Sequence, residues 1–355
     1  MLGSIALELV LDIPRPFGVG RIVHSFIIGH NNARRLMAPL VSVVICTRNR
    51  GDYILRAVNS ILASDYLYYE LLIVDQSDDR ATWRRLAPLL EGSSSIRYFA
   101  LAVPGKANAL NHAWRWARGE YLAITDDDCT MTPNCLSKLV AAFQANSALG
   151  LIFGDVAAAH HDERHRYIPA ARMRDAKTIH HSHDFLTIPV HRPGSWMNWG
   201  IGANMAVRTA ALADIQGWDP CICAGEKFGS GDDHDLAFRL LHAGYEIHFC
   251  PAARVVHYGF RGLMHIRQYH WLVGRGFGAS CIKYLRCGLL YHASIRTIAS
   301  HLLRLAMHWA RLRRSESGPF VLGWLSGFAA GLAQPLNKKA LCFEKKATAG
   351  HTFYA

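Results

Sequence analysis

Three consecutive acids, Asp126, Asp127 and Asp128, follow a short apolar run that ends at Thr125. Adjacent carboxylates repel one another, and a hard cation with oxygen ligands offsets that cost. A divalent metal at such a site bridges a diphosphate and stabilises the negative charge that develops as the diphosphate leaves. The run therefore indicates metal-assisted departure of a diphosphate. The alternative is a plain loop whose first acid caps the next helix.

A second acidic group, Asp232, Asp233 and Asp235, comes directly after the Gly-Ser-Gly segment at 229–231. These acids match the start of a helix, where the helix dipole favours negative charge. Asp235 has a basic neighbour one helical turn further on, Arg239, and an ion pair explains it. The pairing leaves Asp232 and Asp233 unexplained. A carboxylate beside a flexible segment suits a general base that meets its substrate after loop closure.

Four further stretches carry weaker signals. Residues 47–50 follow the first strand-like run and are placed to contact a nucleotide. Residues 105–111 match a helix start near a phosphate. The two glycines within residues 200–205 allow close approach of a backbone, and His257 ends an apolar run.

Apolar runs alternate with helically spaced segments along residues 41–125. Strands are expected at 41–46, 71–74, 96–101 and 121–125, and helices at 53–63, 83–90 and 106–117. This alternation predicts an α/β fold with a mostly parallel sheet and helices on both faces. Ligands of such sheets bind at the carboxyl ends of the strands, where Asp75 and Asp126 are expected.

Taken in order, these pieces resemble the family 2 glycosyltransferases, over about residues 41–257. The resemblance covers the opening strand, a nucleotide-base aspartate, an Asp-x-Asp metal motif, a Gly-Asn-Met stretch, a Glu-Asp-x-Asp-Leu motif and a later histidine. The matching positions are residues 41–49, Asp75, Asp126 with Asp128, residues 202–205, residues 232–236 and His257. Asp232 stands where the family's acidic motif has Glu.

The resemblance implies a GT-A (Rossmann-like) fold and an inverting transfer of one sugar. The donor is a nucleotide-diphosphate sugar, the acceptor a glycan or lipid-linked hydroxyl, and the cofactor divalent Mn or Mg. Asp233 is the expected base, Asp128 and His257 the metal ligands, Asp75 the partner of the nucleotide base, and Asp126 a ligand of ribose or metal. The other expected nucleotide contacts are Thr47, Arg48, Asn49, Lys106, Asn108 and Asp127, and the expected contacts to acceptor or donor sugar are Gly202, Asn204 and Asp232.

Two other functional classes share some of these features. A nucleotidyltransferase making a nucleotide sugar has the same sheet and metal aspartates, but it carries a glycine-rich loop after the first strand, which residues 46–50 lack. A nucleic-acid-binding module needs a recognisable motif, and none is present. Processive polysaccharide synthases carry a Gln-x-x-Arg-Trp motif and several membrane spans. Residues 267–271 do not fit that motif, which favours transfer of a single sugar.

The net charge of +12 is concentrated in one part of the chain. Residues 260–355 hold fourteen Lys or Arg and two acids, whereas the preceding residues hold 25 of each sign. A tail that is both basic and apolar favours an anionic membrane surface over nucleic acid. The nine cysteines form no Cys-x-x-Cys pair, and the start of the chain lacks the features of a secretory leader. We therefore expect reduced thiols in a cytoplasmic protein.

The chain is expected to divide into an extension at 1–39, the GT-A domain at 40–259 and a helical tail at 260–355. In the extension, Pro14, Pro16 and Gly18 are expected to break any long element.

The tail is expected to be helical in two pieces before Gly318. Residues 318–336 are almost wholly apolar, and Gly323, Gly327 and Gly331 predict a smooth face for close helix packing. This stretch is shorter than the roughly 20 residues of a full membrane span. We expect a shallow or re-entrant attachment to the inner face of the cell membrane, in bacterial cell-surface or exopolysaccharide assembly. The alternative is an ordinary packed helix.

Overall fold

The computed structural model describes residues 5–15, 18–28, 38–161, 166–172, 175–181, 200–259, 261–290, 295, 298–299, 302–303 and 317–345. The chain forms two compact units, Met1–Pro39 and Leu40–Ala355.

The first unit contains an antiparallel pair of long strands, β1 (Ile5–Arg15) and β2 (Gly18–Ile28). Pro14 pairs with Val19, and Arg15 with Gly18, so the proline and glycine lie at the turn end of a hairpin. The strands thus end where these residues were expected to interrupt an element, although Pro14 itself belongs to β1. A two-stranded ribbon has only edge strands, where a proline removes no necessary hydrogen bond.

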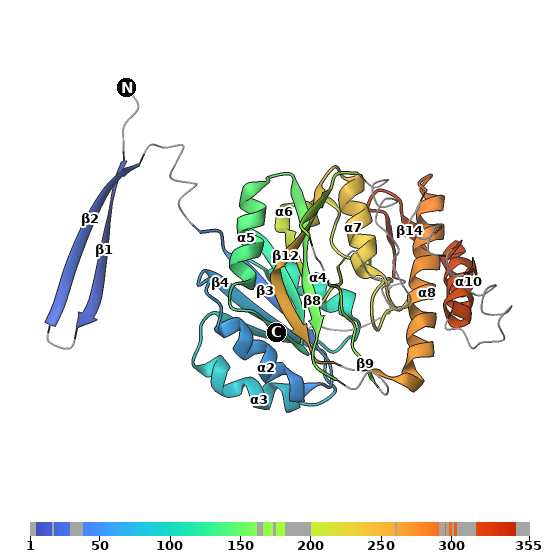
Figure 1. Cartoon of the computed structure of the whole chain (residues 1–355), viewed down its shortest axis with the longest axis horizontal. Helices are drawn as coiled ribbons and strands as arrows, with labels where there is room; N and C mark the ends of the chain where they lie inside the picture. Colours follow the sequence, from blue (N-terminus) through green and yellow to red (C-terminus); the bar gives the residue numbers. More distant parts are fainter. Residues whose placement is uncertain are drawn as a thin grey trace, which may run out of the picture. The chain divides into compact units, whose positions relative to one another are not determined.

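A nine-stranded mixed sheet forms the centre of the second unit (Figure 1). From one edge, the strands are β10 (Lys177–Ile179), β12 (Glu246–His257), β8 (Leu149–Ala158), β11 (Asn204–Arg208), β6 (Tyr121–Asp126), β3 (Val41–Thr47), β4 (Tyr69–Asp75) and β5 (Ile96–Ala100), with β7 (Cys129–Met131) paired to β12. Three of the parallel pairs are neighbours, since β3 lies between β6 and β4, and β5 lies outside β4, and β12 with β8 forms a fourth. The strand β11 runs antiparallel between β6 and β8.

Helices cover both faces of this sheet because the central strands are apolar on both sides. In β3, Val43 and Ile45 belong to one buried cluster, and Val44 belongs to the other. The first cluster is completed by α2 (Gly51–Leu62), α3 (Ala81–Glu91) and α5 (Cys135–Ala145), and the second by α4 (Lys106–Trp116), α6 (Thr209–Asp214) and α7 (Asp232–His242). The expected strands and helices of residues 41–125 are therefore confirmed to within a few residues.

The described part of the tail packs onto this unit. The long helix α8 (Leu263–Arg286) follows the short pairing of β13 (Arg261–Gly262) with β9 (Arg166–Tyr167), and α10 (Ser317–Leu332) lies beside α8 (Figure 1). A short hairpin, β14 (Leu336–Asn337) with β15 (Cys342–Phe343), follows α10. Most of the second helical piece expected before Gly318 lies outside the described residues.

Glycines on both helices form the contact between α8 and α10. A Cβ atom added at Gly323 or Gly327 would lie 2.0 or 1.9 Å from the carbonyl oxygen of Trp271 or Arg275. On α8, a Cβ atom added at Gly274 would lie 2.1 Å from the carbonyl oxygen of Phe320. The glycines therefore form the smooth helix-packing face that their spacing predicted. Among the described residues, no helix combines the length and the apolar character needed to cross a membrane.

Gly327→Ala should destabilise the protein, because the added methyl group meets the backbone of α8. Forcing extra volume into a packed contact costs about 1–3 kcal/mol, and thermal unfolding measures the loss. Gly318→Ala is the matched control on the same helix, since a Cβ atom there meets nothing within 4 Å. An unchanged melting temperature in Gly327→Ala would show that the two helices are not tightly packed.

Candidate functional site

The carboxyl ends of β4, β3 and β6 bring predicted residues into one row. Thr47 pairs in register with Asp75, and Cys46 with Asp126. This follows from parallel strands that end at the same sheet edge. The Asp-rich run therefore begins where the sheet opens to a ligand.

Basic side chains neutralise the three acids of that run. Lys106 Nζ lies 2.5 Å from Asp126 Oδ1, and Arg50 contacts both Asp127, at 3.0 Å, and Asp128. Burial raises the pKa of Asp127 to about 6 even though Arg50 lowers it. The sequence placed Arg50 in a stretch expected to contact a nucleotide, but it did not indicate that Arg50 pairs with these acids.

The Oγ1 of Thr47 donates a hydrogen bond of 2.7 Å to Asp127. Both side chains are buried. Thr47 and Asp127 thus orient one another and Arg50 at the floor of the site.

Four groups able to hold a metal gather beside the run. Ligand atoms of Asp126, Asp128, Cys129 and His257 all lie within 4.8 Å of one another. The sheet brings His257 there, because β12 pairs it with Cys129 on β7. Carboxylate oxygens and one imidazole nitrogen suit Mn²⁺ or Mg²⁺, so the residues fit the expected metal. Nothing in the sequence separated Cys129 from the other cysteines.

A backbone carbonyl fixes the orientation of the His257 ring. Its Nδ1 lies 2.8 Å from the carbonyl oxygen of Pro169, and its Nε2 lies 3.0 Å from Asp128 Oδ1. A carbonyl acceptor makes Nδ1 the protonated nitrogen and leaves Nε2 available as a ligand. Burial opposes ionisation of Asp128, but His257 and Arg50 together hold the pKa of that carboxyl well below its usual range.

The second acidic group lies at the first turn of α7. Gly231 precedes it with φ of 100°, a left-handed conformation that favours glycine. Asp233 Oδ2 accepts a hydrogen bond of 3.3 Å from the backbone N–H of Gly202, and Asp233 Oδ1 accepts one of 2.9 Å from that of His234. Although burial acts in the other direction, His234 and these hydrogen bonds lower the pKa of Asp233.

Asp232 and Lys106 connect the two acidic groups. A Cβ atom added at Gly202 would lie 3.8 Å from both Asp232 Oδ2 and Lys106 Nζ. Burial and the neighbouring Asp233 raise the pKa of Asp232 to about 6, against the effect of Lys106. The two motifs, about a hundred residues apart in the chain, thus meet at one lysine.

Asp75 and its neighbours form a loop beside the row. Asp75 Oδ1 accepts a hydrogen bond of 2.8 Å from the backbone N–H of Ser77, and Asp75 Oδ2 accepts one from Tyr98. Asn49 Nδ2 donates to Asp78 at 2.7 Å, and Arg48 lies 3.6 Å from the same carboxylate. Arg48 and Asn49 therefore join the loops after β3 and β4 at the rim of the site.

Two of the residues expected at the site, Asn204 and Asn108, have hydrogen-bond partners within the protein. Asn204 is fully buried, and its Nδ2 donates to the carbonyl oxygens of Asp155 and Ala253 at 3.1 and 3.0 Å. The amide of Asn204 thus crosslinks strands within the sheet. Asn108 Nδ2 donates to the carbonyl oxygen of Val103 at 2.9 Å, which fixes the loop before α4.

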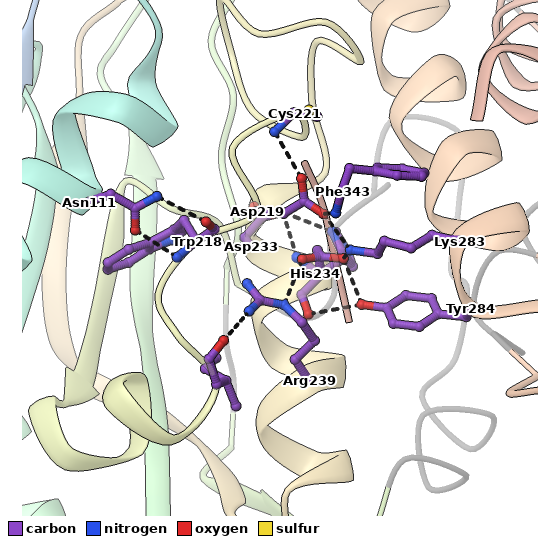
Figure 2. A network of polar contacts seen from close by, with 12 residues as sticks. Asn111, Trp218, Asp219, Cys221, Asp233, His234, Arg239, Lys283, Tyr284 and Phe343 are labelled. Atoms are coloured by element: carbon purple, nitrogen blue, oxygen red, sulfur yellow. Dashed lines mark hydrogen bonds and ion pairs between the residues drawn. The ribbon is translucent and has the colours of Figure 1, made fainter. Parts of the chain in front are cut away.

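A buried charge network lies behind the acidic turn of α7 (Figure 2). The expected pair is present, with Arg239 Nε 3.0 Å from Asp235 Oδ2. Lys283 of α8 contacts Asp235 and lies 2.8 Å from Asp219 Oδ2. Sequence reasoning missed Lys283, which is separated from both acids by about fifty residues or more.

Residues 42–215 match Glycosyl transferase family 2. A putative colanic acid biosynthesis glycosyl transferase of Escherichia coli is 36% identical over 106 residues, which cover 29% of this chain and 37% of the relative. An uncharacterized glycosyltransferase of Nostoc is 30% identical over 113 residues, which cover 32% of this chain and 35% of the relative. These matches span about a third of the length of each relative.

A solved structure has the same fold. The mannosyltransferase from Pyrobaculum calidifontis, in complex with GDP-mannose and Mn²⁺, aligns with a TM-score of 0.55 at 17% identity. The alignment covers 84% of this chain and 88% of that chain. Together with the strand order, this likeness confirms the expected GT-A fold.

Proposed function

Because the chain belongs to glycosyl transferase family 2, we propose that it transfers one sugar, with inversion, from a nucleotide-diphosphate sugar to a hydroxyl acceptor. The E. coli relative named for colanic acid biosynthesis supports an acceptor in bacterial cell-surface or exopolysaccharide assembly. The acceptor in this proposal is a glycan or a lipid-linked glycan.

The observation that carries the proposal is the meeting of two acidic groups around Lys106. Asp126, at the end of β6, pairs with Lys106 at 2.5 Å, and the charge of Asp232, at the start of α7, acts on the same ammonium group. An inverting transfer needs this separation of tasks. One side holds the leaving diphosphate, and the other takes the proton of the attacking hydroxyl.

The diphosphate side is built from the Asp-rich run. Asp128 and His257, with Asp126, would hold the metal, and Lys106 adds a positive charge beside them. When bound, Mn²⁺ or Mg²⁺ supplies the positive charge that stabilises the negative charge of the departing diphosphate. The nucleoside is assigned to the row at Thr47 and Asp75.

The proton side is built from the first turn of α7. Asp233 takes the proton of the acceptor hydroxyl while the oxygen of that hydroxyl attacks the anomeric carbon of the donor sugar. The hydrogen bonds from Gly202 and His234 hold the Asp233 carboxylate in place. Asp232 lies next to Lys106 and Gly202, and we assign it to the sugar between the two sides.

The tail supplies a surface for a membrane-bound acceptor. The outer face of α10 exposes Leu322, Leu325 and Leu332 by 63%, 55% and 55%, and Lys338 and Lys339 are exposed in the hairpin that follows. An apolar helix face bordered by lysines suits an anionic lipid surface. We propose that the enzyme lies on the cytoplasmic face of the cell membrane, without crossing it through α10.

Metal removal is the first test of this mechanism. EDTA should abolish sugar transfer, and added Mn²⁺ or Mg²⁺ should restore it. Asp128→Ala should remove the metal-dependent thermal shift that the nucleotide sugar produces. Asp52→Ala is the matched control, because Asp52 is an exposed acid outside the cluster. Transfer that continues unchanged in EDTA would exclude the metal role.

Replacing each acid of the α7 pair tests the base. Asp233→Asn keeps the shape and removes the proton acceptor, so turnover should fall about 10²- to 10⁴-fold. Donor KM and metal affinity should stay near the wild-type values, and Asp232→Asn should be milder. The opposite ranking would move the base to Asp232. Loss of donor binding in Asp233→Asn would assign Asp233 to the metal or nucleotide.

The pH profile separates the same two acids. A general base works when ionised, so the rate falls as the pH drops through its pKa. Asp232, with its pKa raised to about 6, would produce an acidic limb near that pH that disappears in Asp232→Asn. Asp233, with its lowered pKa, should produce the limb at more acidic pH.

Vesicle flotation tests the tail. At low salt, the full-length chain should float with vesicles that contain anionic lipid, and less with neutral ones. The double variant Leu322→Ser/Leu325→Ser should float less. Leu67→Ser is the control, because Leu67 is 85% exposed but lies outside the tail. A full-length protein that stays in solution with anionic vesicles at low salt would refute membrane attachment.

A further inference from the structure

The helix α8, from the tail, packs against the loop and helix turn that carry Asp232 and Asp233. We infer that α8 is a positioning element for this carboxylate pair, an inference that rests on the proposed function. Three contacts carry it, at Gly276, Phe277 and Lys283, all on α8.

The first contact is between backbones. A Cβ atom added at Gly276 would lie 1.7 Å from the carbonyl oxygen of Ser230, two residues before Asp232. Gly229 is also close to α8, since a Cβ atom there would lie 2.6 Å from a side-chain methyl carbon of Leu272. The Gly-Ser-Gly loop is therefore pressed onto α8, and its glycines are required by contact and by positive φ.

The second contact passes through an aromatic ring. Phe277 and His234 have ring centroids 5.0 Å apart. On its other side, His234 Nδ1 lies 2.9 Å from Asp233 Oδ1. The side chain of Phe277 thus packs against the imidazole of His234, which in turn contacts the proposed base, Asp233.

The third contact is the buried charge network (Figure 2). Lys283 has no exposed surface, and it joins Asp235 on α7 to Asp219 in the preceding loop. Tyr284, next along α8, donates a hydrogen bond of 2.6 Å to Asp235 Oδ1. Buried ion pairs add little net stability, but they fix geometry because each partner is costly to leave unpaired.

Together these contacts hold the first turn of α7 against α8. Asp233 is then fixed between α8, through His234, and the backbone N–H of Gly202. A displacement of about 1 Å in a reacting group costs about 10²-fold in rate. A clamp on this turn therefore acts on turnover.

Two glycines of α8 make a matched test. Gly276 faces Ser230, whereas a Cβ atom at Gly278 would lie 2.0 Å from the carbonyl oxygen of Trp324 on α10. Both Gly276→Ala and Gly278→Ala should lower the melting temperature. Gly276→Ala alone should reduce kcat, by about 10²-fold, with donor KM near the wild-type value. Equal kcat in the two variants would overturn the inference.

A readout without activity separates this inference from the proposed function. Amide hydrogen exchange of the segment 229–236 should become faster in Gly276→Ala and stay as in the wild type in Gly278→Ala. Unchanged exchange in Gly276→Ala would refute the positioning role. A wild-type protein that transfers no sugar would refute the proposed function, while the exchange result still decides the positioning.

A second pair applies if Gly276→Ala does not fold. Phe277→Leu removes the ring against His234, and Phe328→Leu alters a phenylalanine of α10 that stacks on Trp324. The same difference is expected in exchange and in kcat, with Phe277→Leu affected and Phe328→Leu spared. Equal behaviour of these two variants would also overturn the inference.

Discussion

The ion pair of Lys106 with the acids around it is the interaction on which the site depends. Burial alone lowers the pKa of a lysine, but Asp126 and Asp232 outweigh it and hold the pKa of Lys106 well above its usual value. Two acidic groups brought this close repel each other unless a cation lies between them. The end of β6 and the starts of α4 and α7 can therefore meet, because the positive charge of Lys106 offsets the repulsion between Asp126 and Asp232.

The central sheet was predictable because each of its central strands is encoded by a short, continuous apolar run of the sequence. The apolar runs of β3, β4 and β6 are buried on both faces, and such strands read as short continuous runs in a sequence. Their parallel order then places Asp75, Thr47 and Asp126 at one edge without further information.

The remaining assignments depend on contacts that a sequence pattern does not contain. Asn204 is polar and follows two glycines, which suggested a sugar contact, but its partners are carbonyl oxygens on β8 and β12. The ion pairs of Arg50 and Lys283 gave no signal, since a basic residue becomes a partner only when the fold brings an acid to it. Pro14 in the N-terminal hairpin is tolerated for a similar reason, because the ribbon has no second neighbour on that side.

The buried lysine of α8 also determines where such an enzyme can be recombined with its relatives. A junction at residue 260, where the charge of the chain changes, leaves out Lys283 and strands Asp219 and Asp235 in the interior without their cation. A junction after Arg286, where α8 ends, keeps the three together. The helix α8 is therefore inherited with residues 40–259, and α10, whose glycines contact the backbone of α8, is inherited with it.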